Sequence, residues 1–362
     1  ASLLHAAAPV LSPAQEIVVG QSAPLTGANA ELGNDIRNGA LAYFHKVNQA
    51  GGLTQGKLKL VTLDDANQTQ RSGENTKKLV TEENVVALFG YASSTLSIPA
   101  MPVVAEHKVP FFAPFTGADT IRKQNEFVYT VRATYADEID KIPNSWGTLG
   151  SPRVAVLHYD DAVGKQNFET VAAVLKKFQK EPVSLSIKRN ADITDADFKA
   201  VLAADPQVLV VTTLYAPAAQ MIKRLKAGGR ATMITSLSFA GASQLAKALG
   251  EQATGVSVSI TVPTPRAKSV AVVRECTEAW TGAGHKEAMS VTALESCIAA
   301  KVLVEGMRRV NKDLTRATLH RSLSALGRYD AGGYVVDFKP NFRHGGSYVG
   351  MALLRPNGEV RE

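Results

Sequence analysis

The first part of the chain alternates short apolar runs with segments in which apolar residues recur every three or four positions. The runs that predict buried strands are residues 17–19, 58–63, 85–90 and 109–113. The clearest helical spacing between them is that of Ile36, Ala40, Phe44 and Val47. Strands and helices in such alternation are typical of a parallel sheet covered by helices on both faces.

The same pattern restarts after a short strand predicted at 127–132. Further strands are predicted at 154–159, 183–187, 208–211, 233–234 and 256–260. Two runs of this kind predict an α/β fold made of two doubly wound parallel-sheet lobes. The chain then ends in predicted helices at 267–283, 290–310 and 315–325 and predicted strands at 333–338 and 347–354. These cannot form a domain of their own, so we expect them to cover the two lobes.

Length and charge agree with this picture. A chain of 362 residues is too long for one ordinary core and suggests two. The net charge is +7, but it is spread along the chain without a basic run or interleaved aromatic residues, so we expect no nucleic-acid partner. No stretch of eighteen apolar residues predicts a membrane span.

The first fifteen residues differ from the rest. Residues 1–15 are predicted to be the remnant of a secretory signal, with Ser12-Pro13-Ala14 as its cleavage site, or else a disordered extension. The two cysteines, Cys276 and Cys297, each lie on the apolar face of a predicted helix. They are either packed thiols or, in an oxidising compartment, one disulfide.

Motifs for chemistry are missing from the sequence. Histidine and cysteine spacings that bind metals do not occur, nor do the glycine-rich loops that bind nucleotides, so we expect no metal and no cofactor. Ser93 has no nucleophile-elbow motif around it, and a hydrolase is therefore disfavoured. We expect a binding protein rather than an enzyme.

Small hydroxyl residues follow two neighbouring predicted strands. Ser93, Ser94 and Thr95 follow the strand at 85–90, and Thr116 and Gly117 follow the one at 109–113. Ligands of parallel sheets bind beyond the carboxyl ends of the strands, where hydroxyls and free backbone N–H groups suit a carboxylate. The sequence therefore predicts half of a site for a small anion-bearing molecule here. The alternative for Ser93 is a plain helix N-cap.

Six segments follow one another in a distinctive order: Gly20-x-x-x-Pro24-Leu25-Thr26-Gly27, Asn48-x-x-Gly51-Gly52, Asp64-Asp65, Val109-Pro110-x-x-x-Pro114-Phe115-Thr116-Gly117-Ala118, Arg132-Ala133-x-Tyr135-x-Asp137-Glu138 and Asp160-Asp161-x-x-Gly164. Taken together, they resemble the type I periplasmic binding proteins, in the branch of the leucine/isoleucine/valine-binding proteins of ABC importers. The resemblance implies crossover hinge strands between the lobes and a ligand in the interlobe cleft. On this basis we expect one lobe at 16–131 plus 263–342, and the other at 132–262 plus 343–362.

The resemblance also implies site residues. It places the carboxylate of the ligand on Ser93, Ser94 and Thr116, and a tyrosine that closes over it at Tyr215, although surface packing is as good an explanation for Tyr215. Tyr91 and Phe115, beside the hydroxyl loops, and Leu32, on the predicted cleft rim, complete the candidate set.

One departure from the family concerns the ammonium group of an amino acid. Ser238 and Phe239 lie where amino-acid-binding relatives carry an acidic residue, and no carboxylate stands there. Asp160 or Asp161 could replace it, but an Asp after a strand is more often a turn former or cap. The ligand is therefore expected to be a keto or aromatic acid, with a branched-chain or other amino acid still open.

These expectations combine into one function. The chain is expected to be a periplasmic, monomeric solute-binding protein that delivers a small carboxylate to the membrane permease of an ABC importer. The alternative is a sensing subunit that presents the bound solute to a membrane receptor or sensor kinase.

Overall fold

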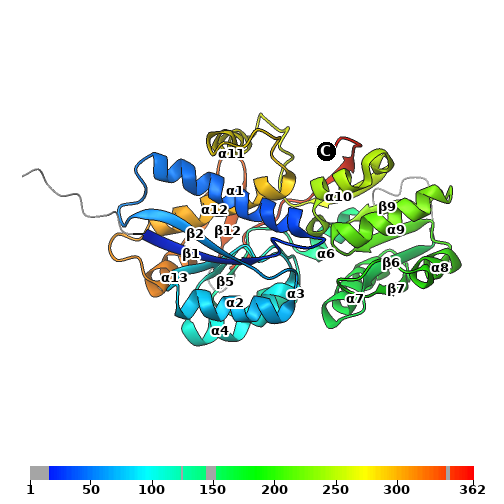
Figure 1. Cartoon of the computed structure of the whole chain (residues 1–362), viewed down its shortest axis with the longest axis horizontal. Helices are drawn as coiled ribbons and strands as arrows, with labels where there is room; N and C mark the ends of the chain where they lie inside the picture. Colours follow the sequence, from blue (N-terminus) through cyan, green and yellow to red (C-terminus); the bar gives the residue numbers. More distant parts are fainter. Residues whose placement is uncertain (1–15, 124, 144–151, 340–342) are drawn as a thin grey trace, which may run out of the picture.

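Two lobes lie side by side along the long axis of the molecule (Figure 1). The computed structural model describes residues 16–123, 125–143, 152–339 and 343–362. The predicted signal remnant or extension at 1–15 lies outside these ranges. Each lobe is a mostly parallel sheet with helices on both faces. The predicted fold class is therefore confirmed.

The first lobe is built on a parallel five-stranded sheet in the order β2-β1-β3-β4-β5. Its elements are β1 (Glu16–Ala23), α1 (Ala30–Gln49), β2 (Lys57–Asp64), α2 (Thr69–Thr81), β3 (Ala87–Phe89), α3 (Ser94–Ser97), α4 (Met101–His107), β4 (Phe111–Phe112), α5 (Asp119–Lys123) and β5 (Val128–Tyr129). Helix α1 covers one face of the sheet, and α2 and α4 cover the other (Figure 1).

The second lobe is built on a seven-stranded sheet in the order β14-β13-β10-β9-β8-β6-β7. Its elements up to residue 260 are α6 (Tyr135–Lys141), β6 (Val154–Tyr159), α7 (Ala162–Lys176), β7 (Val183–Ile187), α8 (Asp195–Ala204), β8 (Val208–Thr212), α9 (Tyr215–Ala227), β9 (Met233–Ser236), α10 (Ala242–Leu249) and β10 (Val256–Ile260). Every residue of β6 and β8 is buried, as expected for central strands covered on both faces.

The last hundred residues return to both lobes. Their elements are α11 (Ala271–Gly282), α12 (Val291–Arg308), α13 (Arg316–Ser324), β11 (Gly327–Asp330), β12 (Val335–Phe338), β13 (Gly350–Leu354) and β14 (Val360–Arg361). Helices α11 and α12 pack against α1, while β13 joins the second sheet antiparallel to β10. Cys276 on α11 and Cys297 on α12 form a disulfide within this layer.

Two short strands and one helix differ from the sequence prediction. The pairing of β11 with β12 and of β14 with β13 was not predicted, because strands of two to four residues carry little periodicity. The predicted helix after Ser93 is broken into α3, a 3₁₀ turn at Ile98–Ala100, and α4. Pro99 lies at the start of that turn and Pro102 at the start of α4, where a proline ring disturbs no helical hydrogen bond.

Three chain segments cross between the lobes and are held together by hydrogen bonds. Thr130 forms a parallel bridge with His344, and the Gly345 N–H donates to the Thr130 carbonyl at 2.9 Å. The Tyr334 hydroxyl donates to the carbonyls of Val131 (2.6 Å) and Thr261 (3.1 Å), which belong to the other two segments. The crossovers thus form one connected hinge.

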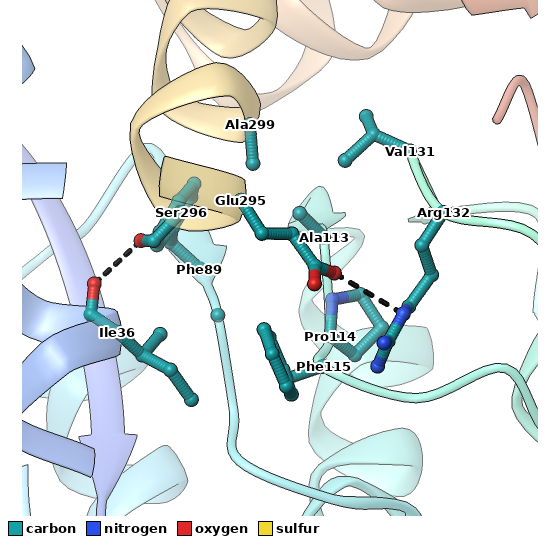
Figure 2. A pocket seen from close by; sticks show the side chains of 11 residues that line it. Ile36, Phe89, Ala113, Pro114, Phe115, Val131, Arg132, Glu295, Ser296 and Ala299 are labelled. Atoms are coloured by element: carbon teal, nitrogen blue, oxygen red, sulfur yellow. Dashed lines mark hydrogen bonds and ion pairs between the residues drawn. The ribbon is translucent and has the colours of Figure 1, made fainter. Parts of the chain in front are cut away.

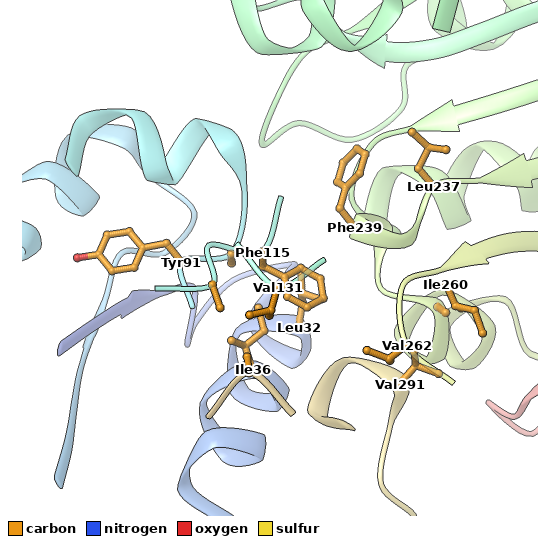
Figure 3. Packing of buried hydrophobic residues seen from close by; sticks show 14 of the residues in the cluster. Leu32, Ile36, Tyr91, Phe115, Val131, Leu237, Phe239, Ile260, Val262 and Val291 are labelled. Carbon is orange, nitrogen blue, oxygen red and sulfur yellow. The ribbon is translucent and has the colours of Figure 1, made fainter. Parts of the chain in front are cut away.

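The lobes also touch away from the hinge. Asn67 and Asn190, which follow β2 and β7, exchange two hydrogen bonds of 2.5 and 3.0 Å. Gln244 on α10 donates to Asp35 on α1 at 2.6 Å. Beside the hinge, buried apolar side chains of both lobes gather as shown in Figure 3, where Phe115 and Phe239 belong to opposite lobes. The structure is therefore one in which the lobes are in contact.

Candidate functional site

Between the lobes lies a hollow with about 250 Å³ of empty space, part of it open to solvent. Its lining comes from both lobes and the crossover between them: Ser93, Ser94, Thr95, Tyr135, Tyr159, Val163, Asn167, Arg189, Leu214 and Phe239. The enclosed part of this space is no larger than about one water molecule, because the lobes are in contact, so a solute would have to enter while they are apart.

The wall from the first lobe consists of hydroxyl groups. The Oγ atom of Ser94 lies 2.6 Å from Oγ1 of Thr116, which lies 3.0 Å from the Tyr135 hydroxyl. Thr116 also accepts a hydrogen bond from the Ala118 N–H at 3.1 Å, so its hydroxyl is held from three directions. The sheet places Ser94 and Thr116 together because β3 and β4 are neighbours and their carboxyl ends share an edge.

Ser93 and Thr95 differ in what their hydroxyls do. Ser93 caps α3, accepting from the Leu96 N–H at 3.3 Å, as its alternative interpretation required. Thr95 is buried, and its Oγ1 has no hydrogen-bond partner among the described residues. A buried hydroxyl without a hydrogen bond costs free energy. A ligand group that hydrogen-bonds to Thr95 in the hollow would remove this cost and so bind more tightly.

The second lobe contributes a cation. Arg189 follows β7, and its guanidinium lies 3.7 Å from the centre of the Tyr159 ring. Its Nε donates to Oδ2 of Asp161 at 2.5 Å. Burial alone would raise the pKa of Asp161, but the hydrogen bond and charge of Arg189 hold it below its ordinary value. Asp161 is therefore ionised, and the pair holds the Arg189 side chain in place.

Tyr159 keeps its proton in this environment. Burial raises the pKa of its hydroxyl, with Arg189 acting in the opposite direction. The hydroxyl oxygen accepts from the Leu214 N–H at 3.2 Å, which leaves its own O–H to donate. Phe239 supplies an apolar wall, its ring centre 4.9 Å from that of Tyr135. The hollow thus combines donors with aromatic surface.

Two positions near the site require glycine because other backbone atoms lie too close for a side chain. A Cβ on Gly117 would lie 2.8 Å from the Tyr135 N atom, and that N–H donates to the Gly117 carbonyl at 3.0 Å. A Cβ on Gly164 would lie 2.0 Å from the Tyr159 carbonyl oxygen. Neither position has space for a side chain, and both hold a lining tyrosine against its neighbour.

The structure brings together part of the predicted set. Ser93, Ser94, Thr95 and Phe239 line the hollow directly, and Thr116 reaches it through Ser94. Asp161 instead caps α7, accepting from the Gly164 N–H at 2.8 Å.

The other predicted residues contact protein groups. Tyr91 points into the first lobe, and its hydroxyl bonds Thr76 at 2.9 Å (Figure 3). Tyr215 is buried near Glu31 of the opposite lobe, and this burial raises the pKa of its hydroxyl to about 12. Leu32 packs beside Gly241.

Ser238 and Phe115 belong to a buried network at the hinge. The Ser238 hydroxyl donates to Glu138 at 2.8 Å and accepts from Arg132. Arg132 lies 3.1 Å from Glu295, and its guanidinium is 4.4 Å from the centre of the Phe115 ring. Figure 2 shows this pair beside a second hollow, of about 260 Å³, within the first lobe. Arg132 is thus ion-paired within the protein.

Six residues that line the hollow were not among the predicted site residues: Tyr135, Tyr159, Val163, Asn167, Arg189 and Leu214. Arg189 follows the predicted strand at 183–187 by two residues, so the carboxyl-end rule applied to that strand would have found it. Within the described ranges, no three His, Cys, Asp or Glu side chains gather as metal ligands would. No described helix is both long and apolar enough to cross a membrane.

Comparison with known proteins places this architecture in a family. The model of the periplasmic binding protein family matches residues 16–358. A substrate-binding periplasmic protein from Ralstonia solanacearum is 32% identical, with a TM-score of 0.89 over 95% of this chain and 99% of that one. A possible leucine/isoleucine/valine-binding protein from Rhodopirellula baltica is 27% identical, with a TM-score of 0.91 over 99% and 98%.

A curated relative points the same way over a shorter stretch. An "Amino acid binding protein" from Pseudomonas aeruginosa is 24% identical over 217 residues, which are 59% of this chain. The chain spans 58% of that protein's length. These relatives are solute-binding proteins rather than enzymes. The predicted resemblance is confirmed, and the chain belongs to the periplasmic binding protein family.

Proposed function

We propose that this protein is the extracytoplasmic solute-binding component of an ABC importer and that it captures a small carboxylate in the interlobe hollow. The observation that carries the proposal is the hydroxyl cluster of Ser94 and Thr116 on the first lobe and Tyr135 at the start of the second, opposite further donors of the second lobe. Preorganised donors in a small, partly closed space favour an anion over its hydrated state.

In this mechanism the solute docks first on the hydroxyl wall of the first lobe. The second lobe, residues 132–262 with 343–362, then swings against residues 16–131 with 263–342 about the three crossovers. The Asn67–Asn190 pair supports this proposal, because its hydrogen bonds join the lobes and are lost when they separate. The closed form, a periplasmic monomer, is what the permease recognises.

The solute is an amino acid or a related keto or aromatic acid. The names of several relatives support an amino acid, since they refer to amino-acid or leucine/isoleucine/valine binding. A thermal-shift screen of amino, keto and aromatic acids tests this directly. A solute at one hundred times its dissociation constant stabilises the protein by about 2.7 kcal/mol. A screen in which no acid stabilises the protein contradicts the proposal.

Ser94→Ala tests the location of the site. Loss of a hydrogen bond to a charged group should weaken binding by about 1.5–3 kcal/mol, measured by calorimetry with the acid found in the screen. Ser97→Ala is the matched control, because the Ser97 hydroxyl lies on the same short helix but donates to the Ser93 carbonyl. Equal affinities of the two variants would place the solute elsewhere.

A further inference from the structure

The charges around the interlobe hollow are unequal. Arg189 is the one charged side chain among the described residues that line it, and no carboxylate lines it. An α-amino acid carries an ammonium group that needs acceptors when it leaves water. The hollow lacks an anionic acceptor for that group and supplies a cation instead.

Two buried or partly buried carboxylates of the second lobe, Asp161 and Glu138, are already used by the protein. Asp161 accepts from the Gly164 N–H (2.8 Å) through Oδ1 and from Arg189 through Oδ2. Glu138 accepts from the Ser238 hydroxyl (2.8 Å) through one oxygen, and from the Ser238 N–H (2.9 Å) and Ser259 hydroxyl (2.5 Å) through the other. Redirecting either carboxylate to a ligand would break hydrogen bonds that hold the second lobe.

Several donors, by contrast, are unused. Among the described residues, Arg189 makes one hydrogen bond, through Nε. Both of its Nη groups therefore remain available to a ligand. Tyr159 can donate its O–H, since its oxygen already accepts from Leu214. On the opposite wall, Thr95 is buried with its hydroxyl unpaired. Both ends of the hollow therefore offer donors.

The position of Arg189 is also fixed before any ligand binds. Asp161 holds its Nε, and the Tyr159 ring lies against its guanidinium plane at 3.7 Å. A planar guanidinium with two free Nη groups matches the two oxygens of a carboxylate. This is the geometry of a receptor for an acid group, because little side-chain entropy is lost when the acid arrives.

We infer that the solute is a small acid without an ammonium group, whose second end is a hydrogen-bond acceptor, foremost a second carboxylate, received by Arg189. The first carboxylate lies on the hydroxyl wall, and the aromatic rings of Tyr135 and Phe239 flank the part between. This inference rests on the proposed function and narrows its ligand class from carboxylates in general to diacids.

Calorimetry with matched acids tests it. Glutarate, valerate and norvaline share a five-carbon chain: glutarate bears a second carboxylate, valerate no further group and norvaline an ammonium. Isophthalate, benzoate and phenylglycine give the same comparison for acids that contain a ring. In at least one series the diacid should bind tenfold or more tightly than both partners. Tighter binding of norvaline or phenylglycine, or no binding of either diacid, overturns the inference.

Arg189→Met provides the sharper test. It should remove the preference for the diacid by tenfold or more, while leaving α-amino acid affinity unchanged or higher, because Oδ2 of Asp161 becomes free to accept. A merely structural Arg189 would weaken all three acids alike. Arg153→Met is the matched control: Arg153 forms an exposed ion pair with Asp205 (2.7 Å) in the same lobe, and its loss should change no affinity.

Ser94→Ala distinguishes failure of the diacid inference from failure of the proposed function. If the hollow is the site, this variant weakens every bound acid equally, whatever its second group. A loss on Ser94→Ala together with no change in preference on Arg189→Met would overturn the diacid inference and leave the proposed function standing. No effect of either variant on a bound acid would overturn both.

Discussion

Arg132 and Arg189 have nearly the same local surroundings, yet they serve different purposes. Each guanidinium lies over an aromatic ring, Phe115 for the first and Tyr159 for the second, and each pairs with one carboxylate. The Arg132 side chain is 1% exposed at the hinge, whereas Arg189 is 13% exposed at the hollow. Burial therefore decides whether such an arginine holds the protein together or can receive a solute.

The energetic consequence of burial follows from desolvation. Burial raises the pKa of Glu295, the partner of Arg132, even though the arginine pulls it down. At the hollow the balance is reversed, since the pKa of Asp161 is lowered. A buried carboxylate that loses its arginine is left without a counter-charge and without water, which destabilises the fold. A partly exposed carboxylate is hydrated instead. Four measurements would break or sharpen this comparison.

The largest effect is expected from Arg132→Met. Removing the cation leaves Glu295 and Glu138 buried without it, so the free energy of unfolding should fall by about 3–5 kcal/mol in urea denaturation. The double variant Arg132→Met/Glu295→Leu should recover part of this loss, because it removes a buried charge as well. A loss below that of Arg189→Met would contradict the assignment of a structural role to Arg132.

A smaller effect is expected at the interlobe contact next to Arg189, where Asn190 pairs with Asn67. Asn190 has a φ of +56°, so Asn190→Gly removes the side chain without straining the backbone. Loss of the interlobe hydrogen bonds should weaken solute binding by about 1–2 kcal/mol, a roughly five- to thirtyfold change in calorimetry. The free energy of unfolding without solute should change much less, and an equal change in both would argue against a contact specific to closure.

Arg189→Met should lower the free energy of unfolding much less than Arg132→Met. The ion pair with Asp161 is partly exposed, and such pairs contribute about 1 kcal/mol or less. Asp161 keeps its cap on α7, because that bond comes from Gly164. The measurement is urea denaturation without solute, beside Arg132→Met. A loss of several kcal/mol would mean that both arginines are structural.

The smallest effect is a pH dependence of closure through Asp35. Burial, the leading cause, raises the pKa of Asp35 to about 6 from 3.8 in the form where Gln244 of the other lobe reaches it. We expect the open form to expose Asp35 to solvent, in which case closure binds a proton, and its advantage is full below 3.8 and is lost as the pH rises through about 6. Solute affinity should be modestly higher at about pH 5 than at about pH 7.

Asp35→Asn is the control for this effect. It keeps an acceptor for Gln244 but cannot titrate, so the affinity should no longer change over that interval. Glu31 and Lys247 lie nearby and remain in both proteins. An unchanged pH profile would assign the dependence to another group.

Much of the fold could be predicted because its signals are local. The apolar runs of β6 and β8 need cover on both faces wherever they are placed, and the spacing along α1 marks one buried stripe. The caps at Ser93 and Asp161 are local for the same reason, since each bonds an N–H three residues ahead. The weakly patterned strands β11 and β14 form only because a partner strand lies beside them.

Only the part of the candidate site that lies on the first lobe could be predicted from the sequence. The order of the strands places Ser94 beside Thr116, and both follow apolar runs that the sequence displays. Tyr91 is three residues from Ser94, yet its side chain turns into the first lobe and bonds Thr76. Arg189 has no unusual sequence context, and its importance comes from the lobe that faces it.

By itself, the amino-acid sequence determined the two α/β lobes, the hydroxyl groups at the strand ends and the family to which they belong. Only the tertiary structure decided that Arg189 faces the hollow, that Arg132 is ion-paired at the hinge, and that Tyr215 is buried near Glu31 of the opposite lobe instead of lining the hollow. The physical reason is range: a strand or cap depends on neighbours in the chain, whereas the solvation and partners of a charged side chain depend on segments far away in sequence.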